Sequence, residues 1–172
     1  MRLTRARLLA AALLLAATAA YAFGPTDSLV SKAPSVLAAP VAPVTLAPGK
    51  AAKVDLAFRV ESGYHINSNT PRSDLLLPTV LRLQPPAELT LAKVNYPPGQ
   101  DVSFAFLPGE KLNVYTGDFT VTATLNAASS LVPGSYRVPG ILRYQACDQR
   151  QCFAPKEIPV SFEVNVARAR KK

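Results

Sequence analysis

The stretch KVDLAFRV, residues 53–60, has an apolar side chain at every second position. Successive side chains of a β-strand point to opposite faces of the sheet, so this alternation predicts a strand with one dry face. The same period of two recurs in DFTVTATLN (118–126) and EIPVSFEVNV (157–166). No stripe at the helical period of 3.6 is found after residue 22. The chain therefore reads as all-β.

Shorter apolar runs, bounded by turn signals such as Pro-Pro and Pro-Gly, predict further strands. They cover residues 41–46, 79–83, 89–96, 112–115 and 135–147. About eight strands with one apolar face each need a second sheet to cover that face. The pattern therefore predicts an immunoglobulin-like antiparallel β-sandwich. A small closed barrel is the second alternative.

Residues 1–22 are typical of a cleavable signal peptide. Three arginines precede an apolar run, Leu8–Ala20, that is too short to span a bilayer, and a small-x-small site predicts cleavage after Ala22. An uncleaved anchor is the alternative. No later apolar stretch reaches membrane-spanning length, so we expect a periplasmic or secreted mature chain that does not span the membrane.

We expect three segments after the signal peptide: a Pro/Ala-rich leader (23–38), a sandwich domain (39–167) and a basic tail (168–172). The chain has 19 Lys and Arg residues, and removing the three in residues 1–22 leaves 16 against 11 acidic residues, a net charge of +5. The basic residues are not interleaved with aromatic residues as in a nucleic-acid-binding face. We therefore predict no nucleic-acid partner and a solvated tail.

Both cysteines of the chain lie in RYQACDQRQCFAP, residues 143–155. Regular alternation places Cys147 with Arg143 and Gln145 on the wet face of its strand, and 148–151 then form a turn. The two cysteines would face each other across the mouth of a hairpin, where a disulfide is feasible. A structural clip, half of a metal site and a redox pair all remain open.

A Cys147–Cys152 disulfide would close a loop of about six residues, which stabilises the fold by roughly 2 kcal/mol, against about 4.7 for a hundred-residue loop. This small effect and the expected exposure leave redox and structural purposes as open alternatives. With His65 the cysteines supply too few ligands for a structural zinc site, so we predict no metal. A copper-handling site of these three residues is the weakest alternative. The spacing is not CxxC, which excludes a thioredoxin active site.

Three stretches, GYHINSNTP (63–71), YPPG…FAFLPGEKLNVYTG (96–117) and RYQACDQRQCFAP, together resemble a known family. They are similar to the periplasmic N-terminal domain of the thiol:disulfide interchange protein DsbD, over roughly residues 39–167. The resemblance implies an immunoglobulin-like sandwich whose cysteine pair works without a cofactor. It implies electron transfer from a membrane-embedded donor to thioredoxin-like periplasmic proteins, including those of cytochrome c maturation.

The resemblance also implies roles for individual residues. Cys152 would form the mixed disulfide with a partner, and Cys147 would resolve it. An aromatic cap, Phe106 or Phe104, would shield the pair, and four side chains would lie near it: His65, Asn67, Tyr144 and Asp148.

Elementary chemistry favours plainer roles for several of these residues. Core packing is the default for the two phenylalanines, and a local hydrogen bond is the default for His65 rather than proton transfer. Arg143 and Arg150 would favour a thiolate, whereas Asp148 would oppose it.

In members of the family that carry all its domains, a membrane domain and a thioredoxin domain follow. Because this chain ends at Lys172, we expect a stand-alone form with a separate electron donor. The alternative is a non-catalytic binding or assembly module with a structural hairpin disulfide.

Overall fold

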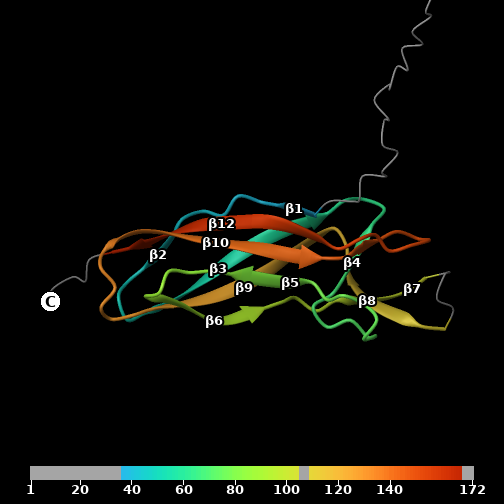
Figure 1. The fold of residues 1–172 in the computed structure, drawn as a ribbon, viewed down its shortest axis with the longest axis horizontal. Coiled ribbons are helices and arrows are strands. Elements are labelled where there is room, and N and C mark those ends of the chain that lie inside the picture. Colours follow the sequence, from blue (N-terminus) through green and yellow to red (C-terminus); the bar gives the residue numbers. More distant parts are fainter. Residues whose placement is uncertain (1–35, 105–108, 168–172) are drawn as a thin grey trace, which may run out of the picture. The chain divides into compact units, whose positions relative to one another are not determined.

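The computed structural model describes residues 36–104 and 109–167, which form twelve strands in three four-stranded sheets (Figure 1). The strands are β1 (Val36–Ala38), β2 (Val44–Leu46), β3 (Ala51–Val60), β4 (His65–Asn67), β5 (Val80–Leu83), β6 (Leu89–Asn95), β7 (Gln100–Ser103), β8 (Lys111–Tyr115), β9 (Asp118–Ala127), β10 (Gly134–Tyr144), β11 (Ala146–Cys147) and β12 (Lys156–Val166). The prediction of an all-β chain is confirmed.

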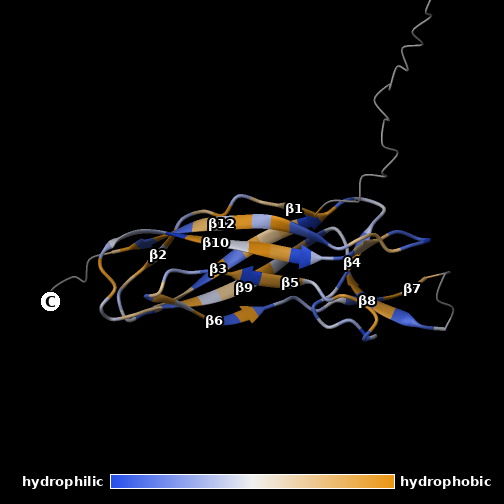
Figure 2. Ribbon diagram, viewed as in Figure 1, coloured by the Kyte–Doolittle hydropathy of each residue, from blue (hydrophilic) through white to orange (hydrophobic). Residues whose placement is uncertain are grey.

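Two of the sheets form a sandwich, with strand orders β1-β3-β9-β6 and β2-β12-β10-β5. Figure 2 shows hydropathy alternating along β10 and β12. The predicted dry faces of β3 and β9 are buried without exception, and they share one core with the inner faces of β10 and β12. One neighbour departs from the antiparallel prediction, because β2 runs parallel to β12. The period of two therefore identified the core correctly.

The third sheet, with order β11-β4-β8-β7, is here called the site sheet. It lies at the end of the sandwich where the arrow of β10 stops (Figure 1). Its strands are short, and β4 is buried at all three positions, His65, Ile66 and Asn67. The chain returns to this sheet from the sandwich by passing from β10 through Gln145 into β11.

Two sequence predictions need correction. Residues 135–147 were expected to be one strand, but β10 ends at Tyr144 and β11 begins at Ala146 in a different sheet. The folded unit was expected to start near residue 39, but β1 already begins at Val36, which pairs with Val60 and is buried.

The predicted signal peptide, the leader before residue 36, Phe106 and the basic tail from residue 168 lie outside the described residues. Within the described ranges, no helix is long and apolar enough to cross a membrane.

Candidate functional site

The cysteines sit at the two ends of a tight turn that Asp148 organises. Its backbone N–H donates to the carbonyl of Gln151 at 2.9 Å, and its Oδ1 accepts from the N–H groups of Arg150 and Gln151 at 2.7 and 2.8 Å. Such a side-chain-to-backbone turn is a common role of aspartate. These two N–H donors lower the pKa of Asp148, and the charge of Arg150 adds to that shift. The carboxylate of Asp148 therefore stabilises the turn by accepting these two hydrogen bonds.

Cys147 and Cys152 form a disulfide with an S–S distance of 2.01 Å and a Cα–Cα distance of 3.9 Å. They pair as an antiparallel bridge, which confirms that they face each other across a hairpin mouth. The predicted exposure of Cys147 is wrong, because this residue is completely buried while Cys152 is exposed. The pair is thus asymmetric, because one cysteine is buried inside the protein and the other is exposed to solvent.

The failed prediction for Cys147 follows from the change of sheet at Gln145. Because β11 pairs with β4 rather than extending β10, Cys147 lies opposite the buried His65, and the alternation along β10 no longer fixes its exposure. Gln145 itself remains satisfied: its amide donates to the carbonyl of Phe153 at 3.2 Å, and its Oε1 accepts from Asn67 Nδ2 at 3.4 Å. Sequence reasoning missed this residue, although it stands inside the cysteine motif.

His65 lies directly opposite Cys147, as its Cα partner in the pairing of β4 with β11. Facing residues of an antiparallel pair project to the same side, so the two side chains are neighbours. His65 is 2% exposed, and its Nε2 has no hydrogen-bond partner among the described residues. The expected local hydrogen bond is therefore wrong for this nitrogen.

Phe104 covers His65. The two rings stack with centroids 4.2 Å apart and planes inclined by 21°, and Phe104 is buried against Leu112 and Val114. Burial lowers the pKa of His65, and the negative charge of Asp148 opposes that shift. Of the two candidate cap residues, Phe104 lies in the described part of the chain. It contacts His65, which faces the buried Cys147.

The other predicted neighbours are placed differently. Asn67 is buried beside the hairpin and donates to the carbonyl of Leu77 at 3.0 Å as well as to Gln145, while its Oδ1 has no partner in the described part of the chain. Tyr144 lies in the sandwich core, where its hydroxyl accepts from the N–H of Val36 at 3.1 Å. The structure thus groups His65, Asn67 and Asp148 around the hairpin, and Tyr144 belongs to the sandwich.

A cavity of about 350 Å³ opens beside this group. His65, Phe104 and Gln149 line it together with Glu61 and Tyr64 from the segment between β3 and β4. The ring of Tyr64 also packs edge-on against Phe153, with centroids 6.0 Å apart. Phe153, which follows Cys152, thereby packs against the residue that precedes the strand β4.

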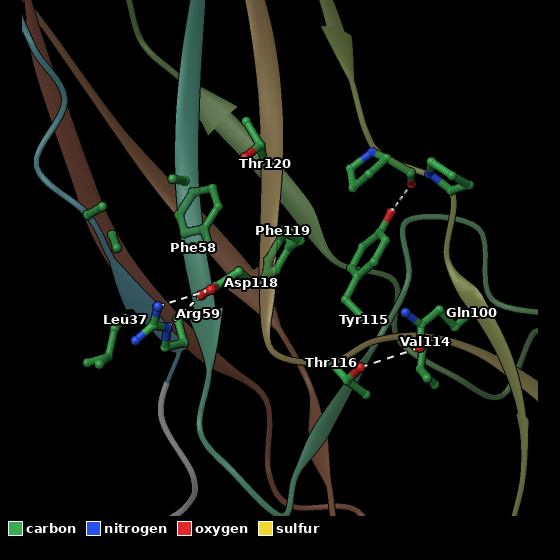
Figure 3. Close-up of a pocket in the computed structure, with 15 residues that line it drawn as sticks. Leu37, Phe58, Arg59, Gln100, Val114, Tyr115, Thr116, Asp118, Phe119 and Thr120 are labelled. Atoms are coloured by element: carbon green, nitrogen blue, oxygen red, sulfur yellow. Dashed lines mark hydrogen bonds and ion pairs between the residues drawn. The ribbon is translucent and has the colours of Figure 1, made fainter.

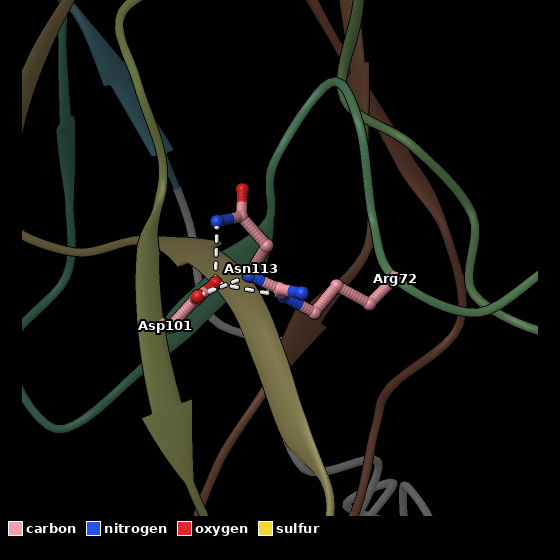
Figure 4. Close-up of polar contacts among 3 residues, drawn as sticks. All are labelled: Arg72, Asp101 and Asn113. Carbon is pink, nitrogen blue, oxygen red and sulfur yellow. Dashed lines mark hydrogen bonds and ion pairs between the residues drawn. The ribbon is translucent and has the colours of Figure 1, made fainter.

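A polar cluster fastens the edge of the site sheet (Figure 4). The carboxylate of Asp101 on β7 accepts from Arg72 Nε at 3.0 Å and from Asn113 Nδ2 at 2.8 Å, and a second guanidinium nitrogen of Arg72 also contacts it. These contacts lower the pKa of Asp101 to about 2. The cluster ties the segment after β4 to the β7–β8 pair from which Phe104 extends.

A larger pocket, about 750 Å³, lies elsewhere among the described residues (Figure 3). Its wall contains a row of stacked rings, in which Phe119 lies 5.3 Å from Phe58 and 4.9 Å from Tyr115 between centroids. Neither cysteine lines it. Size alone therefore does not identify the place of the cysteine chemistry. No group of three or more His, Cys, Asp or Glu side chains within the described residues could hold a metal ion.

Comparison with known proteins identifies the family of the chain. The family model described as the N-terminal part of the thiol:disulfide interchange protein DsbD matches residues 33–163, and the chain belongs to this family. The matched range includes both cysteines of the candidate site.

Solved structures with a similar fold include the DsbD N-terminal domain of Neisseria meningitidis in the reduced form. It is 22% identical over 65% of this chain and 77% of that chain, with a TM-score of 0.43. The N-terminal periplasmic domain of ScsB from Proteus mirabilis is 12% identical over 76% of this chain and 44% of that chain, with a TM-score of 0.47. No individually curated protein matches the chain.

Proposed function

We propose that this protein is an exported thiol–disulfide exchange domain that passes reducing equivalents from a membrane electron donor to thioredoxin-like proteins. The observation that carries the proposal is the asymmetry of the cysteine pair, in which Cys147 is buried and Cys152 is exposed. Exchange proceeds by attack of a thiolate on a disulfide sulfur, so an incoming partner needs one accessible sulfur and not two.

In the proposed reaction, the Cys152 thiolate attacks a sulfur of the partner disulfide. One partner sulfur leaves as a thiolate, and the other stays bonded to Cys152. Cys147 then attacks the Cys152 sulfur, which forms the Cys147–Cys152 disulfide and releases the second partner sulfur. Two electrons move to the partner in total, and the exchange needs no cofactor.

The side chains around the hairpin receive supporting roles in this proposal. Phe104 acts as a cap that keeps solvent away from the His65 and Cys147 side, and Phe106 remains a second cap candidate. Asp148 holds the turn that presents Cys152, because its carboxylate accepts two backbone N–H groups of that turn. Asn67 and Gln145 fix β4 against the hairpin.

Location and partners follow from the same proposal. The predicted signal peptide, residues 1–22, would deliver the protein to the periplasm, where disulfides persist. Membership of the DsbD N-terminal family supports thioredoxin-like partners. We also propose that these include proteins of cytochrome c maturation. The electron donor would be membrane-embedded.

A trapping experiment tests the proposal. In Cys147→Ser the resolving sulfur is absent, so incubation with an oxidised thioredoxin-like protein should accumulate a mixed disulfide through Cys152. The matched control, Cys152→Ser, should accumulate little, because its remaining cysteine is buried. Non-reducing electrophoresis and mass spectrometry of the linked peptide measure both.

The reduction potential of the wild-type pair separates this function from its alternative, a binding or assembly module with a structural clip. The burial of Cys147 and the rigid turn are also what a clip requires. A potential below about −300 mV together with no exchange would favour the clip and contradict the proposal.

A further inference from the structure

The strongest unexplained feature near the cysteines is the Nε2 atom of His65. Buried polar atoms in folded proteins are nearly always hydrogen-bonded, and an exception calls for an explanation. This nitrogen lies in a side chain only 2% exposed and has no partner among the described residues. An unpartnered ring nitrogen retains the capacity to accept or donate a proton.

The position of His65 connects it to one cysteine and not to the other. Its Cα partner is Cys147, and facing residues have Cβ atoms about 4.5–5.5 Å apart, within reach of side-chain contact. Phe104 stacks on the imidazole at 4.2 Å and limits the access of water. Cys152 is exposed and can lose its proton to solvent directly.

A buried thiol has a different requirement. Thiols in apolar surroundings ionise with difficulty, and only the thiolate attacks a disulfide. Cys147 is completely buried, and Phe104 covers His65, the residue that faces it across the strands, so little water reaches this side of the hairpin. The resolving step therefore needs a base on the protein side.

We propose that His65 accepts the proton of the Cys147 thiol during the resolving step, an inference that rests on the proposed exchange function. The Cys147 S–H bond breaks as its proton passes to the imidazole, and the sulfur attacks Cys152 in the mixed disulfide. The S–S bond between Cys152 and the partner breaks, and the leaving partner thiolate takes the proton from the imidazolium. The imidazole returns to its neutral form, so protons and electrons balance.

The electrostatic surroundings suit a neutral base. Burial lowers the pKa of His65, against a smaller opposing influence of Asp148 from the hairpin turn. The other titratable side chains that line the adjoining cavity, within the part of the chain that the structure describes, are Glu61 and Tyr64. From β7 and the residue after it, Val102 and Phe104 contribute no charge to this cavity. The imidazole is then unprotonated at neutral pH and ready to accept.

An aromatic disulfide that releases a coloured thiolate, such as 5,5′-dithiobis(2-nitrobenzoate), resolves the two steps. The reduced protein should release one thiolate when Cys152 attacks and a second when Cys147 resolves the mixed disulfide. In His65→Gln we expect the second phase to slow about 100-fold at pH 7, a typical loss for a proton acceptor, while the first phase stays within about twofold. Tyr136→Phe, in the sandwich strand β10, removes a hydroxyl that donates to the carbonyl of Val132 and is the control, which should leave both phases unchanged.

The pH profile distinguishes proton transfer from a packing role. The second-phase rate of the wild type should level off above the pKa of His65, whereas that of His65→Gln should continue to rise about tenfold per pH unit as hydroxide takes over. A circular-dichroism melt of each variant checks folding, and the wild-type profile remains informative if the variant unfolds. A wild-type second phase that shows no such plateau overturns the inference.

The outcomes also separate the two proposals. Equal second phases in His65→Gln and wild type overturn the role of His65 and leave the exchange function standing. A wild type that lacks the first phase overturns the exchange function, and the inference with it.

Discussion

The sandwich and the site sheet are built on opposite principles. The strands β3, β9, β10 and β12 of the sandwich are 10 or 11 residues long and bury apolar faces against each other. The strands of the site sheet have 2 to 5 residues, and β4 buries a histidine and an asparagine that each have an unpartnered atom in the described structure.

This difference indicates that the sandwich stabilises the fold and that the candidate site lies in the site sheet. The strands β3 and β9 of the sandwich alternate buried apolar residues with less buried ones, whereas the site sheet buries polar side chains and begins where the strand β10 is interrupted. Such departures concentrate at functional sites, where the rest of the fold must hold them in place. The long strands therefore stabilise the fold, and the short ones position Cys147 and the buried polar side chains beside it.

The largest effect on stability should come from a cavity in the sandwich. Leu142 is completely buried in its core, and Leu142→Ala should lower the free energy of unfolding by about 2–5 kcal/mol, because the lost contacts leave a void. Denaturant unfolding measures it. Leu75 is 93% exposed, and Leu75→Ala should change stability by less than about 0.5 kcal/mol. Equal losses for both would contradict the assignment of the core.

Glycine substitutions compare the two regions directly. A Cβ at Gly140 would lie 2.5 Å from the backbone oxygen of Arg82 and 2.6 Å from Leu83 Cδ2, so Gly140→Ala should destabilise the sandwich by about 1–3 kcal/mol. A Cβ at Gly99 would lie 2.1 Å from Asn113 Oδ1 and 2.9 Å from Ser68 Cβ, so Gly99→Ala should displace the Asn113 side chain that donates to Asp101. Thermal unfolding should show the smaller loss for Gly99→Ala, because its close contacts are side-chain atoms and not backbone, and the reverse order would contradict the comparison.

Removal of the disulfide should have a modest effect on stability and a complete effect on exchange. Cys147→Ala/Cys152→Ala opens a loop of about six residues, for which the chain-entropy estimate is roughly 2 kcal/mol. Reduction of the wild type with dithiothreitol should lower the free energy of unfolding by a similar amount. Retention of full biological activity by the double variant would point instead to a binding module.

The smallest expected effect concerns the polar cluster at the edge of the site sheet. The pKa of Asp101 is lowered from 3.8 to about 2 in the folded protein, so its stabilising contribution is fully present above pH 4. That contribution is lost as the pH falls through the interval from about 4 to about 2, where the folded carboxylate takes up its proton. Asp101→Asn should flatten the pH dependence of the melting temperature in this interval. An unchanged slope would show that the cluster does not stabilise the fold.

Local chemistry made much of the fold predictable. The alternation in residues 53–60, 118–126 and 157–166 identified the buried faces of three long strands, because the side-chain period of a strand is a property of its own backbone. The hairpin between the cysteines was predictable for the same reason, since a tight turn joins residues that are close in sequence.

The errors arose where the local pattern depends on distant partners. Alternation through Gln145 predicted an exposed Cys147, but the strand changes sheets there, and Gln145 finds its partners in Asn67 and Phe153. Nothing in residues 143–147 alone signals that change. The alternation of side chains along the strand therefore could not predict that Cys147 is buried.

The sequence by itself determined the all-β class, the faces of the long strands and the placing of both cysteines at one turn, because these depend on neighbours along the chain. Only the tertiary structure decided that Cys147 is buried, that His65 faces it with a nitrogen that has no partner among the described residues, and that Phe104 stacks on His65. These features depend on which strands meet in the site sheet. That pairing joins segments far apart in the chain, and the side-chain period of a single strand carries no information about it.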